Sequence, residues 1–185
     1  TLDAYVEEER LLVLLSGNVI SAQYGSEHRA ADLFDLKGEV QALLSKFCLD
    51  KYRFICYDSV SALIESALAV EINGTYAGFL GQVGKSIAQG FDIDEPLFAC
   101  ELKVADLQRG WRTEKKLVPL PRFPNVHRDL AFVVNTGTNH ETVARAITEA
   151  GGTLLANLVL FDLYTGDQIG AGNKSLAYSL EFQPF

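Results

Sequence analysis

The sequence contains no methionine, one tryptophan and only three cysteines among its 185 residues. Three is an odd number, and Cys48, Cys56 and Cys100 form no CxxC pair. Neither a disulfide framework nor a paired-cysteine zinc site is therefore indicated. Because each cysteine has apolar neighbours, we expect buried free thiols in a reducing cytoplasm, and the scattered histidines suggest no metal site.

Long apolar runs are also missing from the sequence. A membrane-spanning helix needs about 20 apolar residues, whereas the run Leu11–Leu15 is only long enough for a buried strand. We therefore expect a cytoplasmic protein with no membrane partner. No signal peptide opens the sequence, and because it begins with Thr1 we expect it to start within a longer protein.

Positive charge is scarce, because 16 Lys and Arg face 24 Asp and Glu, for a net charge of −8. This balance argues against generic binding of nucleic acid through a broad basic surface. No Ser/His/Asp or Cys/His pattern stands out, and the carboxylates form no recognisable acid–base pair. We therefore predict no catalytic residue in this chain.

Two groups of glycines superficially suggest nucleotide binding. Gly166, Gly170 and Gly172 precede Lys174, but Asn173 intervenes and an alternating strand pattern follows where a phosphate loop requires a helix. We expect a glycine-rich turn there. A second group, Gly78, Gly81 and Gly84, follows a hairpin turn and not the first strand of a βαβ unit, so turn or packing glycines are favoured.

The prolines divide the sequence into two predicted domains, 1–116 and 117–185. A polar and basic stretch from Gly110 to Lys116 leads into Pro119, Pro121 and Pro124. Proline fixes its own φ and pushes the preceding residue toward extended geometry. We interpret this segment as a linker, with a structured loop inside one domain as the alternative.

The first domain is predicted to mix antiparallel strands with helices. Asp32 is a suitable N-cap for a helix whose apolar positions include Leu36 and Val40. Asn73-Gly74 between apolar runs predicts a tight β-hairpin. Alternation at Phe98–Leu102 predicts a half-buried strand, and Val104–Gln108 a short helix.

The second domain has a β-α-β-β pattern. The strands are expected at Leu130–Val134, Leu154–Tyr164 and Leu176–Phe182. Between the first two strands, Thr138 and Glu141 fit a capping box, and Gly151-Gly152 would end that helix. The order is an incomplete ferredoxin-like unit that lacks the last helix and strand of β-α-β-β-α-β.

A tyrosine and an acid stand close together in the segment Leu160–Tyr164. If side chains alternate there, Asp162 and Tyr164 share one face of the sheet, with Phe161 and Leu163 on the other. Such a pair on an open sheet face could stack on and hydrogen-bond an unpaired base. A solvated face with an amphipathic tyrosine is the alternative explanation from the pattern alone.

Several short motifs follow one another in order along the sequence. Those in the second domain are Phe123-Pro124, Arg128–Ala131, Leu160–Asp162, Tyr164, Gly166, Gln168–Gly170 and Lys174–Ala177. Those in the first are Asp32–Val40, Leu80–Val83 and Phe98–Leu102. The part from Phe123 to Phe182 resembles the ferredoxin-fold anticodon-binding domain of the bacterial β subunit of phenylalanyl-tRNA synthetase, and the earlier part resembles the end of the synthetase-like core of the same subunit.

This resemblance implies a non-catalytic part of an ATP- and magnesium-dependent phenylalanine–tRNA ligase with two α and two β chains. The implied partners are the α subunit, which holds the active site, a second β subunit and tRNA(Phe). The family reads the anticodon on the open face of its last sheet, and the matching positions here are Asp162, Tyr164, Ser175 and Ala131. We expect Tyr164 to stack on an anticodon base, while Asp162 and Ser175 hydrogen-bond its edge.

The acidic charge limits what the second domain can do alone. From Leu117 onward four basic residues face six acidic ones, for a net charge of −2, so we expect this part to bind tRNA weakly by itself. One alternative is a ferredoxin-like regulatory module that binds a small molecule at a symmetric dimer interface. A free-standing enzyme is a further alternative, which the missing catalytic cluster disfavours.

Overall fold

The computed structural model describes residues 5–19, 29–49, 51–57, 63–112 and 123–183. The chain forms two compact units, Thr1–Lys116 and Leu117–Phe185. Both units combine helices with antiparallel sheets, which confirms the predicted α+β class. Within the described ranges no helix is long and apolar enough to cross a membrane. The predicted linker falls mostly in 113–122, outside the described residues.

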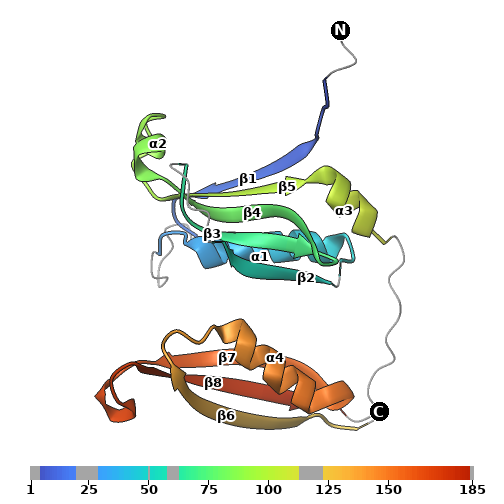
Figure 1. The fold of residues 1–185 in the computed structure, drawn as a ribbon, viewed down its shortest axis with the longest axis vertical. Helices are drawn as coiled ribbons and strands as arrows, with labels where there is room; N and C mark the ends of the chain where they lie inside the picture. Colours follow the sequence, from blue (N-terminus) through green and yellow to red (C-terminus); the bar gives the residue numbers. More distant parts are fainter. Residues whose placement is uncertain (1–4, 20–28, 50, 58–62, 113–122, 184–185) are drawn as a thin grey trace, which may run out of the picture. The chain divides into compact units, whose positions relative to one another are not determined.

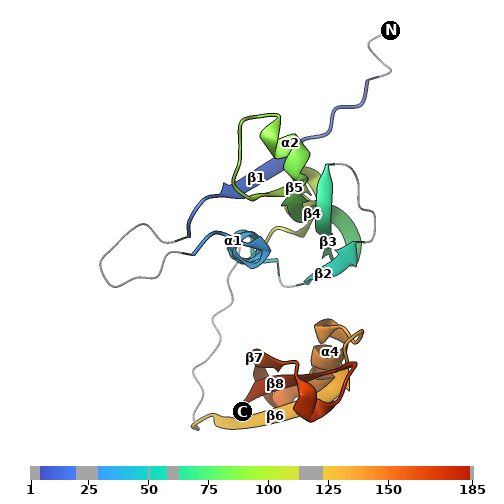
Figure 2. The same ribbon diagram turned by 90° about the vertical axis from the view of Figure 1, so that its left-hand side faces the viewer.

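The first unit is a five-stranded sheet in the order β1-β5-β4-β3-β2. A helix, α1 (Leu33–Lys46), lies along one face of this sheet (Figures 1 and 2). Two short helices, α2 (Lys85–Gln89) and α3 (Val104–Gly110), flank β5 in the sequence. The strands are β1 (Arg10–Ser16), β2 (Tyr52–Tyr57), β3 (Ile64–Ile72), β4 (Thr75–Val83) and β5 (Leu97–Lys103).

The core of this unit forms where the apolar stripe of α1 meets one face of the sheet. Leu36, Val40 and Leu44 of the helix are fully buried, as their spacing predicts. They pack in one cluster with side chains from every strand of the sheet. The predicted strand around Cys100 and the short helix after it are confirmed as β5 and α3.

The central hairpin depends on residues that accept unusual backbone geometry. Asn73 and Gly74 have φ of 52° and 78°, so both positions of the β3–β4 turn are left-handed and the predicted hairpin is confirmed. Within β4, a Cβ at Gly78 would lie 1.9 Å from the Glu101 carbonyl oxygen, and one at Gly81 2.3 Å from that of Ser66. These are packing glycines of a strand, not a nucleotide-binding loop.

The first strand differs from its prediction. The run Leu11–Leu15 was expected to be wholly buried, but β1 is an edge strand that pairs only with β5 in the sheet. Its side chains alternate between half-buried and exposed, and Leu12 and Leu14 are each 57% exposed. The reason is that Leu11, Val13 and Leu15 face the α1 side and pack against its core, while Leu12 and Leu14 face the other side of the sheet.

The cysteines are also less uniformly buried than expected. Cys100 lies in the core on the central part of β5, and burial raises the pKa of its thiol to about 12. Cys48 is only half-buried, in the turn after α1, and Cys56 is exposed on the edge strand β2. All three are free thiols. The burial predicted for Cys56 from its apolar sequence neighbours is therefore wrong, because a residue on an edge strand has a neighbouring strand on one side only.

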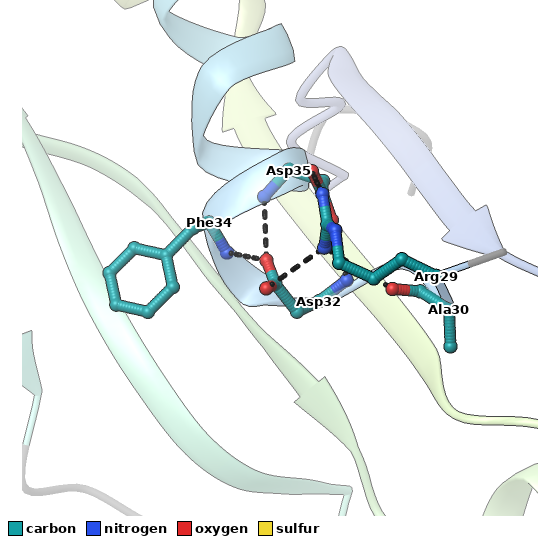
Figure 3. Close-up of polar contacts among 5 residues, drawn as sticks. All are labelled: Arg29, Ala30, Asp32, Phe34 and Asp35. Atoms are coloured by element: carbon teal, nitrogen blue, oxygen red, sulfur yellow. Dashed lines mark hydrogen bonds and ion pairs between the residues drawn. The ribbon is translucent and has the colours of Figure 1, made fainter. Parts of the chain in front are cut away.

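A network of four groups begins α1 (Figure 3). Asp32 caps the helix, and its carboxylate accepts hydrogen bonds from the backbone N–H of Phe34 at 2.8 Å and of Asp35 at 3.0 Å. In return, the Asp35 carboxylate accepts from the Asp32 N–H at 2.8 Å, which completes a capping box. The Arg29 guanidinium donates two hydrogen bonds to the Asp35 carboxylate, at 2.7 and 2.8 Å. The predicted N-cap is confirmed.

The second unit is a three-stranded sheet in the order β6-β8-β7. Its strands are β6 (Val126–Asn135), β7 (Leu155–Tyr164) and β8 (Asn173–Phe182), and α4 (His140–Gly151) lies on one face (Figure 1). Short 3₁₀ turns occur at Gly152–Leu154 and Asp167–Ile169. The predicted β-α-β-β order is therefore confirmed.

Tyr178 is the centre of this small core and is fully buried. Its hydroxyl lies 3.0 Å from Nδ1 of His140 at the start of α4, and the two rings stack at 5.6 Å. Burial raises the pKa of the Tyr178 phenol. Ile147 of α4 packs against the same cluster, so the helix is held on this face by both a polar and an apolar contact.

The predicted capping box of α4 is wrong by one residue at its N-cap. The helix begins after Asn139, whose side chain makes no capping hydrogen bond. Thr138 instead belongs to a preceding turn, in which its backbone N–H donates to the Asn135 carbonyl at 2.9 Å. The other end is as predicted, because Gly152 takes a φ of 56° where the helix stops.

The Arg29–Asp35 contact should make the first unit sensitive to acid. Hydrogen bonding to Arg29 lowers the pKa of Asp35 from 3.8 to about 2. Because the folded-state pKa is lowered, the stabilisation is present above the unfolded pKa and is lost as the pH falls through the folded value. We expect stability of the wild-type chain to fall between about pH 4 and pH 2 more steeply than that of Asp35→Asn, as followed by urea unfolding.

Asp94→Asn is the matched control, because Asp94 is an exposed acid in the loop before β5. Its pH profile should match that of the wild type over the same range. If Asp35→Asn kept the full wild-type dependence of stability on pH, the Arg29–Asp35 contact would not contribute to the acid sensitivity of the chain.

Candidate nucleic-acid interface

The three-stranded sheet has one face covered by α4 and one face without a helix. In β8 the side chains of Leu176, Tyr178 and Leu180 are buried against α4. Successive side chains of a strand point to opposite faces, so Ser175 and Ala177 belong to the open face. The cross-strand register then assigns residues of β6 and β7 to the same face.

A β-bulge in β7 decides which face carries Asp162. Leu160 pairs with Tyr178 on the α4 face, but the next paired residue, Asp162, lies opposite Ala177 on the open face. With simple alternation, Leu160 and Asp162 would share a face, and the carboxylate would project toward the apolar core under α4. The extra residue, Phe161, shifts the register and is 57% exposed.

The four residues predicted as a site come together on the open face. Tyr164 lies directly opposite Ser175 on the neighbouring strand. Asp162 and Ala131 lie on either side of Ala177, in the next row across the sheet. The strand register therefore places Asp162 and Tyr164 on one face, as predicted. The β-bulge that brings Asp162 to this face was not predicted.

Small side chains form the floor between the polar groups. Ala131, Ala177 and Ser175 reach only a short way above the sheet, whereas Tyr164 stands at its edge and is 41% exposed. Val133, which the sequence prediction did not include, pairs with Ser175 in the row of Tyr164 and is 58% exposed. A flat base could therefore approach the floor with tyrosine on one side and valine on the other.

Gly166 supports the tyrosine ring. A Cβ at this position would lie 2.3 Å from the Tyr164 Oη and 2.6 Å from its Cζ, so the ring rests against the bare glycine backbone. The φ of Gly166 is −178°, which any residue can adopt. The requirement is thus for space beside Tyr164, which local sequence does not reveal.

The glycine-rich loop that follows makes no phosphate cradle. Gly170 and Gly172 both have φ of 81°, and the backbone N–H of Asn173 donates to the Gly170 carbonyl at 3.4 Å to close a turn. Strand β8 begins there, as the alternating pattern predicts. Lys174 donates to the Thr136 carbonyl at 2.9 Å, so this lysine ties the turn to the loop after β6.

The open face is acidic. Asp129, Asp162 and Glu181 all occupy its register positions. Carboxylates repel a phosphate backbone but accept hydrogen bonds from the N–H groups of bases. In the part of the chain that the structure describes, no group of three or more potential ligand side chains could hold a metal ion. The arrangement suits contact with the edge and face of a base.

Family comparisons divide the chain in the same way as the fold. Residues 2–104 match a family described as the phenylalanyl tRNA synthetase beta chain CLM domain, which is more than half of the sequence. The chain belongs to the phenylalanyl-tRNA synthetase β-chain family. Residues 121–185 match the ferredoxin-fold anticodon binding domain, which contains the face just described.

Similar proteins are β subunits of bacterial phenylalanine–tRNA ligases. That of Listeria innocua is 30% identical over 96% of this chain and 22% of its own length. That of Salinibacter ruber is 34% identical over 96% of the chain and 22% of its length. The Symbiobacterium thermophilum protein is 32% identical over 91% of the chain and 19% of its length. The chain thus spans about a fifth of these relatives.

Gly166→Ala should alter the site without unfolding the unit. The added methyl group would force the Tyr164 ring away from its position, while the extended backbone remains permitted. We expect weaker RNA binding with little change in melting temperature, measured by fluorescence anisotropy and calorimetry.

Gly137→Ala, in the turn after β6, is the control, because a Cβ at Gly137 would meet only the Asn135 side chain and not the tyrosine. It should leave RNA affinity unchanged. Wild-type affinity in Gly166→Ala would show that the ring position is unimportant.

Proposed function

We propose that this chain is a non-catalytic part of the β subunit of a phenylalanine–tRNA ligase, and that it contacts the tRNA anticodon and supports a catalytic α subunit. One observation carries the anticodon role. The bulge in β7 brings Asp162 to the uncovered face beside Tyr164 and Ser175, within the region that matches the anticodon-binding family.

The chemistry of these groups fits an unpaired base. A tyrosine ring stacks on a base with a gain of about 1–3 kcal/mol. The Asp162 carboxylate accepts hydrogen bonds from ring or exocyclic N–H groups, and the Ser175 hydroxyl can donate or accept. Ala131 matters through its small size, because it lets the base approach the sheet.

The remaining parts of the reaction belong to other components of the proposed enzyme. ATP and magnesium would bind in the α subunit, and a second β subunit would complete an assembly of two α and two β chains. In the cytoplasm this enzyme would join phenylalanine to tRNA(Phe). The role of the present chain is then positioning of tRNA and support of the α subunit.

The bare face of the five-stranded sheet supports a protein partner for the first unit. Antiparallel sheets that face water usually carry polar residues on that face. Here the outward positions include the exposed Leu12 and Leu14 and the half-buried Ile55, Phe79 and Val83, next to the Arg10–Glu101 and Arg53–Glu71 ion pairs. Large exposed apolar patches mark interaction sites, and this one includes a hollow of about 360 Å³ beside Tyr57 and Tyr76.

The regulatory-module alternative has one feature in its favour, an apolar groove of about 620 Å³ between α4 and β6. Its lining includes Leu130, Phe132 and Ile147, with Thr142 as a polar member. Small-molecule sites usually contain several convergent polar groups that orient the ligand. The groove better suits the second helix of a complete ferredoxin-like unit, which a right-handed crossover would place on this face.

Tyr164→Ala in the assembled enzyme should reduce kcat/KM for tRNA about ten-fold or more, because loss of one stacked base costs roughly 1–3 kcal/mol. Tyr164→Phe keeps the ring and should retain most activity. Phenylalanine activation without tRNA should be unaffected by both changes. Unchanged aminoacylation kinetics in Tyr164→Ala would refute the anticodon role.

Leu14→Asp tests the protein interface, because Leu14 is 57% exposed on the bare face. A charge there should weaken copurification with the α subunit while leaving the melting temperature of this chain nearly unchanged. Phe34→Asp is the control, since Phe34 is 75% exposed on α1, in the opposite layer. Loss of α-subunit binding in the Phe34 variant alone would contradict the assignment.

A further inference from the structure

Four chain segments meet at one end of the five-stranded sheet. These are the C-terminal ends of α1 and α3, the start of β2 and the β3–β4 turn (Figure 1). In a chain with a net charge of −8, this end gathers basic side chains. We define the basic corner as Lys46, Lys51, Arg53, Arg109, Trp111 and Arg112, all of them exposed.

Backbone contacts hold the corner together. The N–H of Arg112 donates to the Phe47 carbonyl at 3.2 Å, which ties the end of α3 to the end of α1. The N–H of Asn73 donates to the Lys51 carbonyl at 2.8 Å, which ties the turn to β2. The basic groups are therefore displayed from fixed positions and do not depend on a single loop.

Two of the basic residues have a local explanation. Lys46 and Arg109 lie in the last turns of α1 and α3, where a cation offsets the negative end of the helix dipole. Arg109 also pairs at 3.0 Å with the largely buried Asp106. These residues alone would not indicate a ligand.

The other three lie outside the helices. Arg112 follows α3, while Lys51 and Arg53 lie at the start of β2. Arg53 lies 3.1 Å from Glu71, with 54% of its side chain exposed. Lys51 and Arg53 line a hollow of about 390 Å³ together with Glu71, Asn73 and Gly74. Asp50, beside Lys51 in the sequence, is outside the described residues.

An exposed aromatic ring accompanies these charges. Trp111 is 54% exposed, and its ring meets that of Phe47 edge-on, with centroids 6.0 Å apart. Phe47 supports the indole from one side and leaves part of its surface in solvent. Basic side chains next to an aromatic platform are the combination that binds unpaired nucleic acid.

We propose that the basic corner binds the sugar–phosphate backbone of RNA. Charge complementarity selects this occupant, because five basic side chains gather here beside the exposed ring of Trp111, in a chain whose net charge is −8. It supplies the phosphate contacts that the acidic sheet face of the other unit lacks. The choice of RNA rests on the proposed function, but the contact is independent of base sequence.

The test measures how the affinity of the assembled enzyme for a labelled tRNA(Phe) transcript depends on salt. Each phosphate contact contributes about 0.7–0.9 to the slope of log K against log salt. Lys51→Gln should lower the slope by about that amount, and Lys51→Gln with Arg53→Gln by about twice as much. The matched control is Lys85→Gln, an exposed lysine in α2 at the other end of the sheet.

The corner variants should weaken binding equally for transcripts with native and altered anticodons, because phosphate contacts carry no sequence information. Tyr164→Ala should weaken binding of the native transcript selectively, with no change in slope. If the corner variants change the salt slope but Tyr164→Ala leaves binding of the native transcript unchanged, RNA binding by the basic corner is supported and the anticodon role of Tyr164 is refuted.

The opposite result would overturn the proposal for the corner. An unchanged slope in the Lys51→Gln/Arg53→Gln variant would show that these charges serve only to protect the edge strand. An equal drop in Lys85→Gln would show a general charge effect. If the double variant loses its melting transition, Arg112→Gln replaces it, and the same slope criterion decides.

Discussion

The pleat of an antiparallel sheet, which sends successive side chains to opposite faces, governs both units of this chain. In each sheet one face packs against helix, namely α1 together with Leu107 of α3 in the first unit and α4 in the second, so every strand divides its residues between a packed side and the opposite side. In the second unit this division separates Tyr178, which anchors the core, from Ser175, three residues earlier in β8 and on the open face. Packing and recognition thus use alternate residues of the same strand.

The two opposite faces differ in chemical character. That of the five-stranded sheet exposes Leu12 and Leu14 next to the Arg10–Glu101 ion pair, a mixture that fits contact with another protein surface. That of the three-stranded sheet combines carboxylates, hydroxyls and one tyrosine over a floor of small residues. The basic side chains of Lys51 and Arg53 lie instead in the other unit, where they line a hollow with Glu71. The two proposals therefore assign base contact and backbone contact to different parts of one chain.

Much of the fold could be predicted because the relevant signals are local. Asp32 as a helix cap and Asn73-Gly74 as a turn follow from preferences that involve only neighbouring residues. The alternation from Leu176 to Phe182 likewise identified β8 and its buried face. Motif resemblance then indicated the residues of the candidate site.

What could not be predicted depends on residues that are distant in sequence. The bulge at Phe161 arises from pairing with β8, and the space beside Gly166 is needed only because the Tyr164 ring lies there. The basic corner was missed because its members are separated by up to 66 positions, from Lys46 to Arg112, and overall charge pointed the other way. The exposure of Cys56 depends similarly on the edge position of β2.

The contrast between Cys56 and Cys100 has a practical consequence for chemical labelling. A thiol reacts through its thiolate, so the buried Cys100, with a pKa of about 12, remains unreactive at neutral pH. Cys56 is exposed on β2, three residues after Arg53. Once the half-buried Cys48 is replaced by serine, a maleimide dye would attach selectively to this strand. The molecule thus carries a natural attachment point for an optical reporter next to its basic corner.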